Sequence, residues 1–293
     1  MNHDQHWHVL GAGAMGTLLR WQFDQTGIPA TLLHHRKGEQ RRRLQANGRS
    51  YEVVAQDLEH GATAPIQRLL LATKAGQIGA ALALASPYLA TNALVLTTAN
   101  GLGFERELPP GQFSLLRAVT TAAAYRDASG DVSVISTGQT EVGNPASSDP
   151  APAWFDQQLA RLPGWSWSPD IMRALGDKFS INCVINALTA VQRCRNGELL
   201  IVDQAGSALA GLCAETEPVL RELGLWNTGS LQERAVQVCR NTAANRSSML
   251  QDVLAGRTTE IGYLNGELIR RAPEATLPLN RALVQTLAQI EAS

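Results

Sequence analysis

The chain has 293 residues, of which 44% are hydrophobic and 17% are charged, and its formal net charge is -1. This composition is typical of a globular protein with one large domain or two ordinary ones. Because the charges nearly balance, they give no reason to expect a nucleic acid or an anionic membrane as a partner.

The cysteines, the polar N-terminus and one uncharged run indicate the compartment. The four cysteines lie in the second half and none forms a C-x-x-C pair, which favours reduced thiols in a cytosolic protein. Residues 1–8 lack the basic and apolar regions of a signal peptide. The uncharged run 75–104 is interrupted by Pro87 and Tyr88, so it is predicted to be helix, turn and buried strand rather than a membrane span. We therefore expect a cytoplasmic protein.

A glycine-rich turn follows the first predicted strand. Residues 7–10 lead into the G-x-G-x-x-G motif that runs from Gly11 to Gly16, and a helix-like segment follows. Strand, glycine turn and helix form the context in which this motif binds a dinucleotide. Gly11 permits the tight turn, Gly13 leaves room for a pyrophosphate, and Gly16 allows close helix packing. A plain tight turn is the alternative.

The second predicted strand, residues 30–33, ends without an acidic residue. An NAD-specific site would place Asp or Glu there to bind the ribose 2′-hydroxyl. Here the strand is followed by His34, His35, Arg36 and Lys37. A cationic turn suits a 2′-phosphate, so we expect NADP(H) rather than NAD(H), with Arg36 as the favoured contact because its planar fork binds phosphate in bidentate fashion. A solvated basic turn is the alternative.

Apolar runs at residues 68–73 and 93–98 are predicted to be strands covered on both faces. Lys74 and Asn100 follow them, at the carboxyl ends where ligands of doubly wound sheets bind. Further strands, some of them considered antiparallel, are predicted at residues 115–124, 132–135, 140–142 and 165–167. One more helix is predicted at residues 153–162. The pattern predicts an α/β, Rossmann-like domain over residues 1–168.

Strand signals end at Pro169, and the rest of the chain is predicted to be an all-α domain over residues 169–293. Its helical patterns cover residues 171–193, 204–223, 230–255, 258–272 and 279–291. The cleft between a nucleotide-binding domain and such a domain is the default expectation for a substrate site.

The first of these helices carries a polar stripe inside an apolar sequence. Lys178, Asn182 and Asn186 recur every four residues, so their side chains share one face, opposite Cys183 and Val184. Buried polar groups without partners cost about 1–3 kcal/mol each. The stripe therefore either faces solvent or a neighbouring helix, or it faces a cleft that holds a polar small molecule.

A second polar cluster lies near residue 250. Asn245, Ser248 and Asp252 are predicted to share a helical face. Thr258 or Thr259 is predicted to cap a helix that starts near Glu260. In that position Glu260 would be either a charge that favours the helix dipole or a functional carboxylate.

The motifs in their order resemble the ketopantoate reductase (2-dehydropantoate 2-reductase) family over nearly the whole chain. They are residues 11–16, 72–75, 100–103, Lys178 with 181–190, 196–199, 247–252 and 259–261. The resemblance implies NADPH-dependent reduction of 2-dehydropantoate to (R)-pantoate, a step toward pantothenate and coenzyme A. It implies no metal, and it leaves a homodimer open.

The resemblance also implies roles for individual residues. The catalytic lysine falls on Lys178 and its paired glutamate on Glu260. Substrate contacts fall on Asn100, Lys178, Asn182, Asn186, Ser248 and Glu260. Cofactor contacts fall on Gly11, Ala12, Gly13, Ala14, Met15, Gly16, Arg36, Lys74 and Asn100. The chain departs from the family at Gly262, where Asp is frequent, and at Arg36, which lies one position late, so that His35 is the alternative holder of the 2′-phosphate.

Three rival functions remain at this stage. The chain could reduce a different branched 2-keto acid, or it could be an NADP(H)-binding regulator without catalysis, although a sensor has no need of a proton donor. In the third, Lys178 would form a Schiff base with a keto acid.

Overall fold

The computed structural model describes residues 5–62, 65–201 and 203–292. The chain divides into two compact units. The first comprises Met1–Ala99 and Phe104–Ile171, and the second comprises Asn100–Gly103 and Met172–Ser293. The short segment Asn100–Gly103 therefore belongs, by its contacts, to the unit formed by the C-terminal part of the chain.

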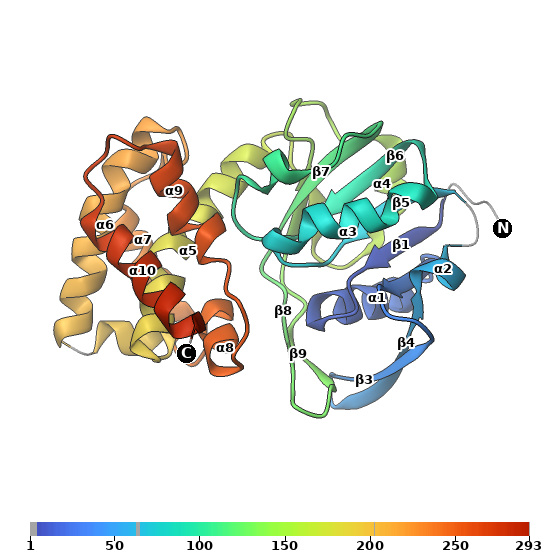
Figure 1. Cartoon of the computed structure of the whole chain (residues 1–293), viewed down its shortest axis with the longest axis horizontal. Coiled ribbons are helices and arrows are strands. Elements are labelled where there is room, and N and C mark those ends of the chain that lie inside the picture. Colours follow the sequence, from blue (N-terminus) through green and yellow to red (C-terminus); the bar gives the residue numbers. More distant parts are fainter. Residues whose placement is uncertain (1–4, 63–64, 202, 293) are drawn as a thin grey trace. The chain divides into compact units, whose positions relative to one another are not determined.

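The first unit is built on one mixed sheet (Figure 1). The strands are β1 (Trp7–Leu10), β2 (Ala30–His34), β3 (Gln40–Ala46), β4 (Arg49–Asp57), β5 (Ile66–Leu71), β6 (Leu89–Thr97), β7 (Phe113–Thr120), β8 (Ala123–Arg126), β9 (Val132–Ser136), β10 (Thr140–Gly143) and β11 (Trp165–Trp167). Their order across the sheet is β11-β10-β7-β6-β5-β1-β2-β4-β3-β9-β8.

The middle of this sheet is parallel and doubly wound. From β1 the chain proceeds through β2 to β4 on one side, and then through β5, β6 and β7 on the other, with every neighbouring pair parallel. The strand order thus reverses at β1, and loops at the carboxyl ends of strands beside such a reversal form the ligand crevice of this class of fold. The fold class expected from the sequence is confirmed.

Helices cover both faces of the sheet. They are α1 (Ala14–Thr26), α2 (Leu58–Gly61), α3 (Ile78–Ala85) and α4 (Ala153–Gln157), with short 3-10 turns at Ala75–Gln77, Ser86–Tyr88, Phe104–Glu107 and Leu159–Arg161. Leu18 and Phe23 of α1 share a core with Trp7, Val9 and Phe155. On the other face α2 packs so closely that a Cβ on Gly61 would lie 2.3 Å from Leu33 Cδ2.

The β3–β4 hairpin was not predicted. Its exposed positions are charged or polar, and its only buried apolar residues are Leu44, Ala46, Val53 and Ala55, so the apolar alternation is short. Asn47 and Gly48 join the strands with φ values of 52° and 70°. Positive φ at both residues is typical of the two-residue hairpin turn, and Asn-Gly is its strongest sequence signal. The predicted strand 115–124 was also wrong as one element, because β7 ends at Thr120.

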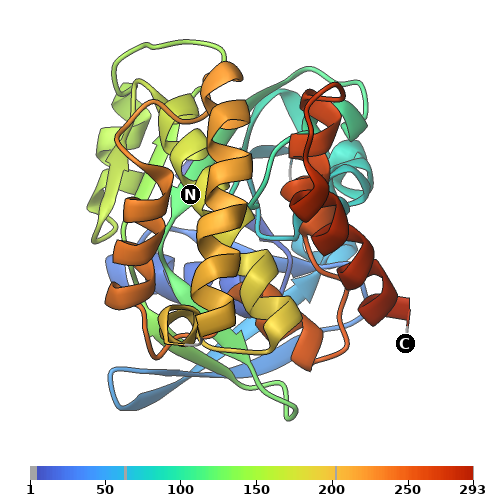
Figure 2. The same ribbon diagram turned by 90° about the vertical axis from the view of Figure 1, so that its left-hand side faces the viewer.

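The second unit is helical (Figure 2). Its helices are α5 (Ile171–Gln192), α6 (Asp203–Glu222), α7 (Leu231–Asn241), α8 (Ser248–Leu254), α9 (Asn265–Arg271) and α10 (Pro278–Ala292), with 3-10 turns at Asn196–Leu200 and Ile261–Tyr263. The single helix predicted over 230–255 was wrong. Residues 242–247 leave the helix because their carbonyls accept hydrogen bonds elsewhere: Asn196 N donates to Asn245 O at 3.0 Å.

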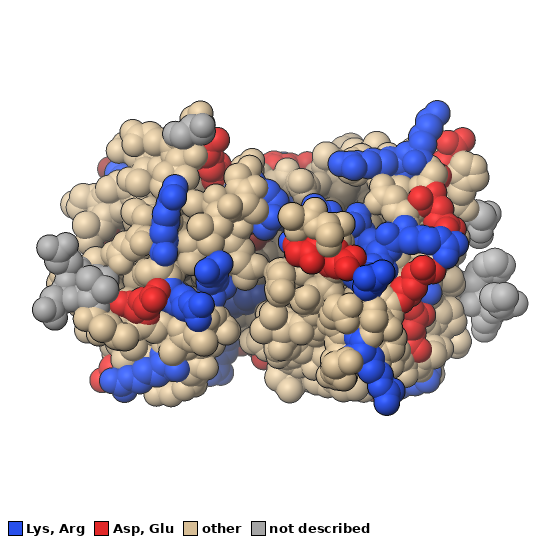
Figure 3. All heavy atoms as spheres, turned by 90° about the horizontal axis from the view of Figure 1, so that it is seen from below, with Lys and Arg blue, Asp and Glu red and all other residues tan. Residues whose placement is uncertain are grey.

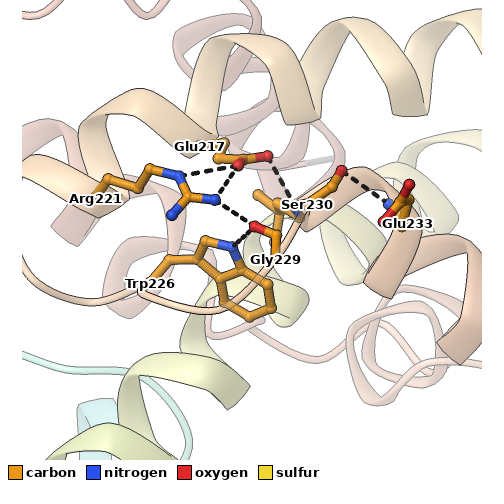
Figure 4. Close-up of polar contacts among 7 residues, drawn as sticks. Glu217, Arg221, Trp226, Gly229, Ser230 and Glu233 are labelled. Atoms are coloured by element: carbon orange, nitrogen blue, oxygen red, sulfur yellow. Dashed lines mark hydrogen bonds and ion pairs between the residues drawn. The ribbon is translucent and has the colours of Figure 1, made fainter.

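A set of hydrogen bonds fixes the connection between α6 and α7 (Figure 4). One carboxylate oxygen of Glu217 accepts two bonds from Arg221, at 3.0 and 2.6 Å, and the other accepts the backbone N–H of Leu231 at 2.9 Å. Arg221 also donates to Gly229 O, and so does the indole of Trp226 at 3.3 Å. The charge of Glu217 thus joins the last turns of α6 to the first residue of α7.

A buried polar network joins four helices of the same unit. Asn265 of α9 donates to Cys183 O of α5 at 2.9 Å and to the side chain of Asn280 of α10 at 2.8 Å. Asn280 donates in turn to Glu215 and Thr216 of α6, both at 2.9 Å. Because Cys183 O belongs to the middle of α5, this network holds the helix that carries the polar stripe.

Among the described residues, no helix has the length and apolar character needed to cross a membrane. Acidic and basic side chains are interspersed on the face shown in Figure 3, in keeping with the formal net charge of -1.

Candidate functional site

The glycine turn lies at the carboxyl ends of adjacent parallel strands. Gly11 N donates to Leu33 O at 3.0 Å, at the end of β2. Gly11 has a φ of +119°, and a Cβ there would lie 2.9 Å from Thr73 Cγ2 and 3.0 Å from the carbonyl of Ala72. Only glycine fits this position without strain. The turn therefore packs against the residues that follow β5.

The other two glycines of the motif have opposite surroundings. A Cβ on Gly16 would lie 1.9 Å from Gly11 O, so the missing side chain is what lets α1 start directly against the turn. Gly13 precedes α1, and a Cβ on it would meet nothing within 4 Å. Close packing at Gly16 thus lets the helix begin against the turn, and the open space at Gly13 leaves its N-terminus accessible. Backbone N–H groups at such an N-terminus can bind a pyrophosphate. The residues 11–16 therefore fit a dinucleotide.

The end of β2 offers exposed cations and no unoccupied carboxylate. His34 is buried, whereas His35, Arg36 and Lys37 are exposed. The acid paired with His34 across the strands is Asp57. Both of its oxygens are already used.

Asp57 accepts the backbone N–H and the ring Nδ1 of His60 at 2.9 and 2.7 Å, and Gly38 N at 2.8 Å. The backbone and side-chain bonds from His60 lower the pKa of Asp57 to about 2. This carboxylate organises the turn after β2, and the cations of that turn are left to face solvent or a ligand.

Lys74 and Asn100 follow β5 and β6. Ala72 N donates to Leu10 O at 2.9 Å, and Thr98 N donates to Leu71 O at 3.3 Å, so the strand ends continue in register past the sheet. Lys74 is half-buried and directly precedes the 3-10 turn Ala75–Gln77. It is one residue away from Thr73, which contacts the glycine turn.

The polar stripe occupies one side of α5. Lys178 and Asn182 are half-buried, and Asn186 is 9% exposed. On the opposite side Cys183 and Val184 are completely buried. Burial raises the pKa of the Cys183 thiol well above its ordinary value, which argues against a nucleophilic role for this cysteine.

Asn100 and Glu260, which are 160 positions apart in sequence, are hydrogen-bonded. The side-chain amide of Asn100 donates to Glu260 Oε2 at 3.1 Å. The same segment is held by Leu102 N, which donates to Tyr263 O at 3.0 Å. Gly101 adopts a φ of +79°, and a Cβ on it would lie 2.3 Å from Tyr263 O. The segment therefore lies directly against the chain around Glu260.

Glu260 is not in the first turn of a long helix, so that prediction was wrong. It precedes the 3-10 turn Ile261–Tyr263, and α9 begins only at Asn265. The Thr259 hydroxyl accepts the backbone N–H of Ile261 at 3.3 Å, at the start of this 3-10 turn rather than of a long helix. The backbone N–H and the hydroxyl of Thr259 both donate to Glu291 Oε1, at 2.9 and 2.6 Å. Glu291 of α10 thus fixes the residue next to Glu260, and no spacing in the sequence pointed to it.

Ser248 is exposed at the first position of α8. The preceding residue, Ser247, is the N-cap, and its hydroxyl accepts Leu250 N at 3.0 Å. It also shares a hydrogen bond of 2.7 Å with Thr189 of α5, three residues beyond Asn186. Asn245 lies outside α8, so the predicted face of Asn245, Ser248 and Asp252 does not form.

The candidate residues divide between the two units. Gly11 to Gly16, Arg36 and Lys74 belong to the first unit. Asn100, Lys178, Asn182, Asn186, Ser248 and Glu260 all belong to the second. Within the described ranges, no group of three or more His, Cys, Asp or Glu side chains could hold a metal ion.

A glycine turn at the strand-order reversal of a parallel sheet, together with an all-helical unit, defines a two-unit protein of the dinucleotide-binding Rossmann class. Two family models match this chain. "Ketopantoate reductase PanE/ApbA" matches residues 7–147, and "Ketopantoate reductase PanE/ApbA C terminal" matches residues 170–291. The chain belongs to the ketopantoate reductase family.

Individual relatives agree with this assignment. The chain is 38% identical over 231 residues to a 2-dehydropantoate 2-reductase of Yersinia pestis, an alignment that covers 76% of this chain and 74% of the relative. Among solved structures, the dimeric ketopantoate reductase from Staphylococcus aureus has a TM-score of 0.84 at 17% identity and covers 98% of this chain and 99% of that one. D-mandelate dehydrogenase with NADH and anilino(oxo)acetate has a TM-score of 0.81 at 20% identity and covers 98% of each chain.

Proposed function

We propose that this chain catalyses the NADPH-dependent reduction of 2-dehydropantoate to (R)-pantoate. The observation that carries the proposal is the Asn100–Glu260 hydrogen bond, which joins two candidate residues in the unit that also carries Lys178, Asn182 and Asn186. The relative in Yersinia pestis, named 2-dehydropantoate 2-reductase, supports the same reaction.

The residues of the first unit fit NADPH. Gly13 leaves open space at the start of α1, where a pyrophosphate would lie. Arg36, or His35 beside it, would hold the 2′-phosphate, and Lys74, which precedes the 3-10 turn after β5, would be a further cofactor contact. Asp57 does not serve the ribose of NADH, since the turn occupies both of its oxygens. The bound cofactor would supply a hydride to the 2-keto carbon.

The residues of the second unit supply the remaining chemistry. Hydride attack builds negative charge on the carbonyl oxygen, and the ammonium of Lys178 stabilises this charge and delivers the proton. Glu260 keeps Lys178 protonated and accepts a hydrogen bond from the product hydroxyl. Asn100, Asn182, Asn186 and Ser248 hold the hydroxyl and carboxylate of the substrate, because carboxamides and hydroxyls both donate and accept.

The test is an assay of NADPH oxidation with 2-dehydropantoate, for the wild type and for Lys178→Ala. We expect kcat of the variant to fall by about 10²-fold or more, because the proton donor is lost, while the dissociation constant for NADPH is unchanged. Met172→Ala, an exposed change on the same helix, is the control and should leave both quantities intact. Near-normal turnover of Lys178→Ala would refute the role of this lysine.

A second candidate is the reduction of a different branched 2-keto acid. The relatives named 2-dehydropantoate 2-reductase do not favour it, and the fold does not separate the two candidates, since D-mandelate dehydrogenase has the same architecture. Comparison of kcat/KM for ketopantoate and 2-ketoisovalerate separates the two candidates. A regulator without catalysis would show no NADPH oxidation with either substrate, and a Schiff-base lysine would be trapped by borohydride without NADPH.

We propose a cytoplasmic homodimer for the assembly in the cell. The relative from Staphylococcus aureus is described as dimeric. The four cysteines are free, as expected in a reducing compartment. Light scattering on the purified chain measures the assembly, and a monomeric mass would exclude the dimer.

A further inference from the structure

Three consecutive arginines on β3 have very different surroundings. Arg41 and Arg43 point to one side of the strand and are exposed, at 62% and 65% for their side chains. Arg41 forms ion pairs with Glu39 at 2.9 Å and Glu52 at 2.6 Å. Arg43 lies 3.8 Å from Asp131. Both are ordinary surface arginines with acidic neighbours, which contribute little to stability.

Arg42 points to the other side of the strand, the side on which Leu44 and Ala46 enter the core. It is half-buried, and its Nη2 donates to Gln40 Oε1 at 3.0 Å. Its Nε is buried and has no hydrogen-bond partner. Across the part of the chain that the structure describes, no carboxylate forms an ion pair with Arg42. A half-buried guanidinium in this state lacks the anion that normally offsets its loss of water.

Arg42 is connected to the cationic turn after β2. Gln40 accepts the hydrogen bond from Arg42 with its Oε1, and its Nε2 lies 3.4 Å from His34 Nδ1. The same ring nitrogen accepts Arg36 N at 3.2 Å. A short chain of contacts therefore runs from the guanidinium of Arg42 to the backbone of Arg36, beside the strand end where the ribose of a dinucleotide lies in this class of fold.

A third arginine approaches from the β8–β9 hairpin. Arg126 ends β8 and pairs with Val132, whose strand is the neighbour of β3. Arg42 Nη1 lies only 3.9 Å from the place a Cβ on Gly130 would take, so it reaches the turn of this hairpin. Burial lowers the pKa of Arg42, and the positive charges of Arg126 and Arg36 lower it further. Neither Arg36 nor Arg126 forms an ion pair with a carboxylate among the described residues.

We propose that Arg42 is a second arginine for the 2′-phosphate of NADPH, acting together with Arg36, and that it determines specificity for the phosphorylated cofactor. Arg126 adds to the positive field of the same pocket. A dianionic phosphate would neutralise the positive charge of Arg42 and relieve the repulsion among the three guanidinium groups. The assignment rests on the proposed use of NADPH. It explains why Arg42 forms no ion pair with a carboxylate among the described residues, whereas Arg41 and Arg43 do.

The test compares Arg42→Ala with Arg43→Ala, a matched change one residue away on the opposite side of β3. Dissociation constants for NADPH and NADH are measured by the quenching of protein fluorescence. For Arg42→Ala we expect NADPH to bind at least about tenfold more weakly, with NADH changed by less than about threefold, because a charge-assisted bond to phosphate is lost. Arg43→Ala should change neither constant.

Arg42→Lys, which keeps the charge and the stem but loses the fork, provides a variant that is expected to fold. It should show an intermediate loss for NADPH alone. An equal loss for both cofactors, or no loss for either, would overturn the proposal.

Binding of 2′,5′-ADP and of ADP separates this proposal from the proposed reaction. If the wild type prefers 2′,5′-ADP and Arg42→Ala abolishes that preference, the pocket is established even where turnover with 2-dehydropantoate fails. If the wild type turns over NADPH but Arg42→Ala keeps the preference, only the assignment of Arg42 falls.

Discussion

At the residue scale, the glycines of the first turn separate two effects that the sequence motif combines. Gly16 is required by packing, because a Cβ there would overlap Gly11 O at 1.9 Å. Gly13 is not required by packing, because nothing lies within 4 Å of its Cβ position. If residues 11–16 bind a pyrophosphate, only the space at Gly13 is reserved for the ligand.

Alanine at each glycine distinguishes these roles. Gly13→Ala should leave thermal unfolding nearly unchanged and weaken NADPH binding, because the methyl group occupies ligand space. Gly16→Ala should lower the free energy of unfolding by about 1–3 kcal/mol, because backbone must move. Calorimetry and cofactor titration of both variants provide the measurements. Normal NADPH affinity in Gly13→Ala would show that the pyrophosphate does not bind at this turn.

At the element scale, helices and strands were predicted correctly where the hydrophobic periodicity was uninterrupted. The predictions were wrong where charged residues or a helix cap interrupted it. Strands β1, β2, β5 and β6 each contain an apolar run and lie close to their predicted positions. The hairpin of β3 and β4 was missed because charged residues fill its outward positions, although Asn47-Gly48 was a usable signal. The predicted helix 230–255 is broken where the carbonyls of Ala243 and Asn245 accept bonds from Gly197 and Asn196. Ser247 then caps a new helix, and helical periodicity registers neither kind of local bond.

The α6–α7 connection carries a prediction at the same scale. Glu217→Gln removes the charge that receives two bonds from Arg221 and one from Leu231 N. We expect the helical unit to lose about 1–2 kcal/mol of stability, since hydrogen bonds to charged groups are stronger than neutral ones. Thermal unfolding followed by circular dichroism measures the change. Glu222→Gln, an exposed change one turn later, serves as the control and should unfold like the wild type.

At the scale of the whole molecule, the sequence indicated two lobes but not the path of the chain between them. Segment Asn100–Gly103 follows β6 of the sheet, yet it makes its contacts with Tyr263 and Glu260. Contacts 160 residues apart leave no trace in local periodicity. The family motifs named Asn100 and Glu260 separately, and their hydrogen bond, like the support of Thr259 by Glu291, became visible only with the fold.

The pH dependence of stability follows from a buried histidine in the first unit. His8 of β1 is 8% exposed, and burial, assisted by the nearby His6, lowers its pKa to about 4. The unfolded chain has the ordinary value of 6.5. Between these pH values the unfolded state binds more protons, so stability rises with pH there and is lost as the pH falls from 6.5 toward 4.

His60 contributes with the opposite sign. Asp57 raises its pKa through a side-chain hydrogen bond, so its contribution is complete below 6.5 and is lost as the pH rises through the raised value. His60 is exposed, and solvent screens the pair, which leaves His8 as the larger effect. Urea unfolding across this pH range should therefore show a falling midpoint on acidification in the wild type and in His60→Gln, and a flatter profile in His8→Phe. An unchanged slope in His8→Phe would show that a different group controls acid unfolding.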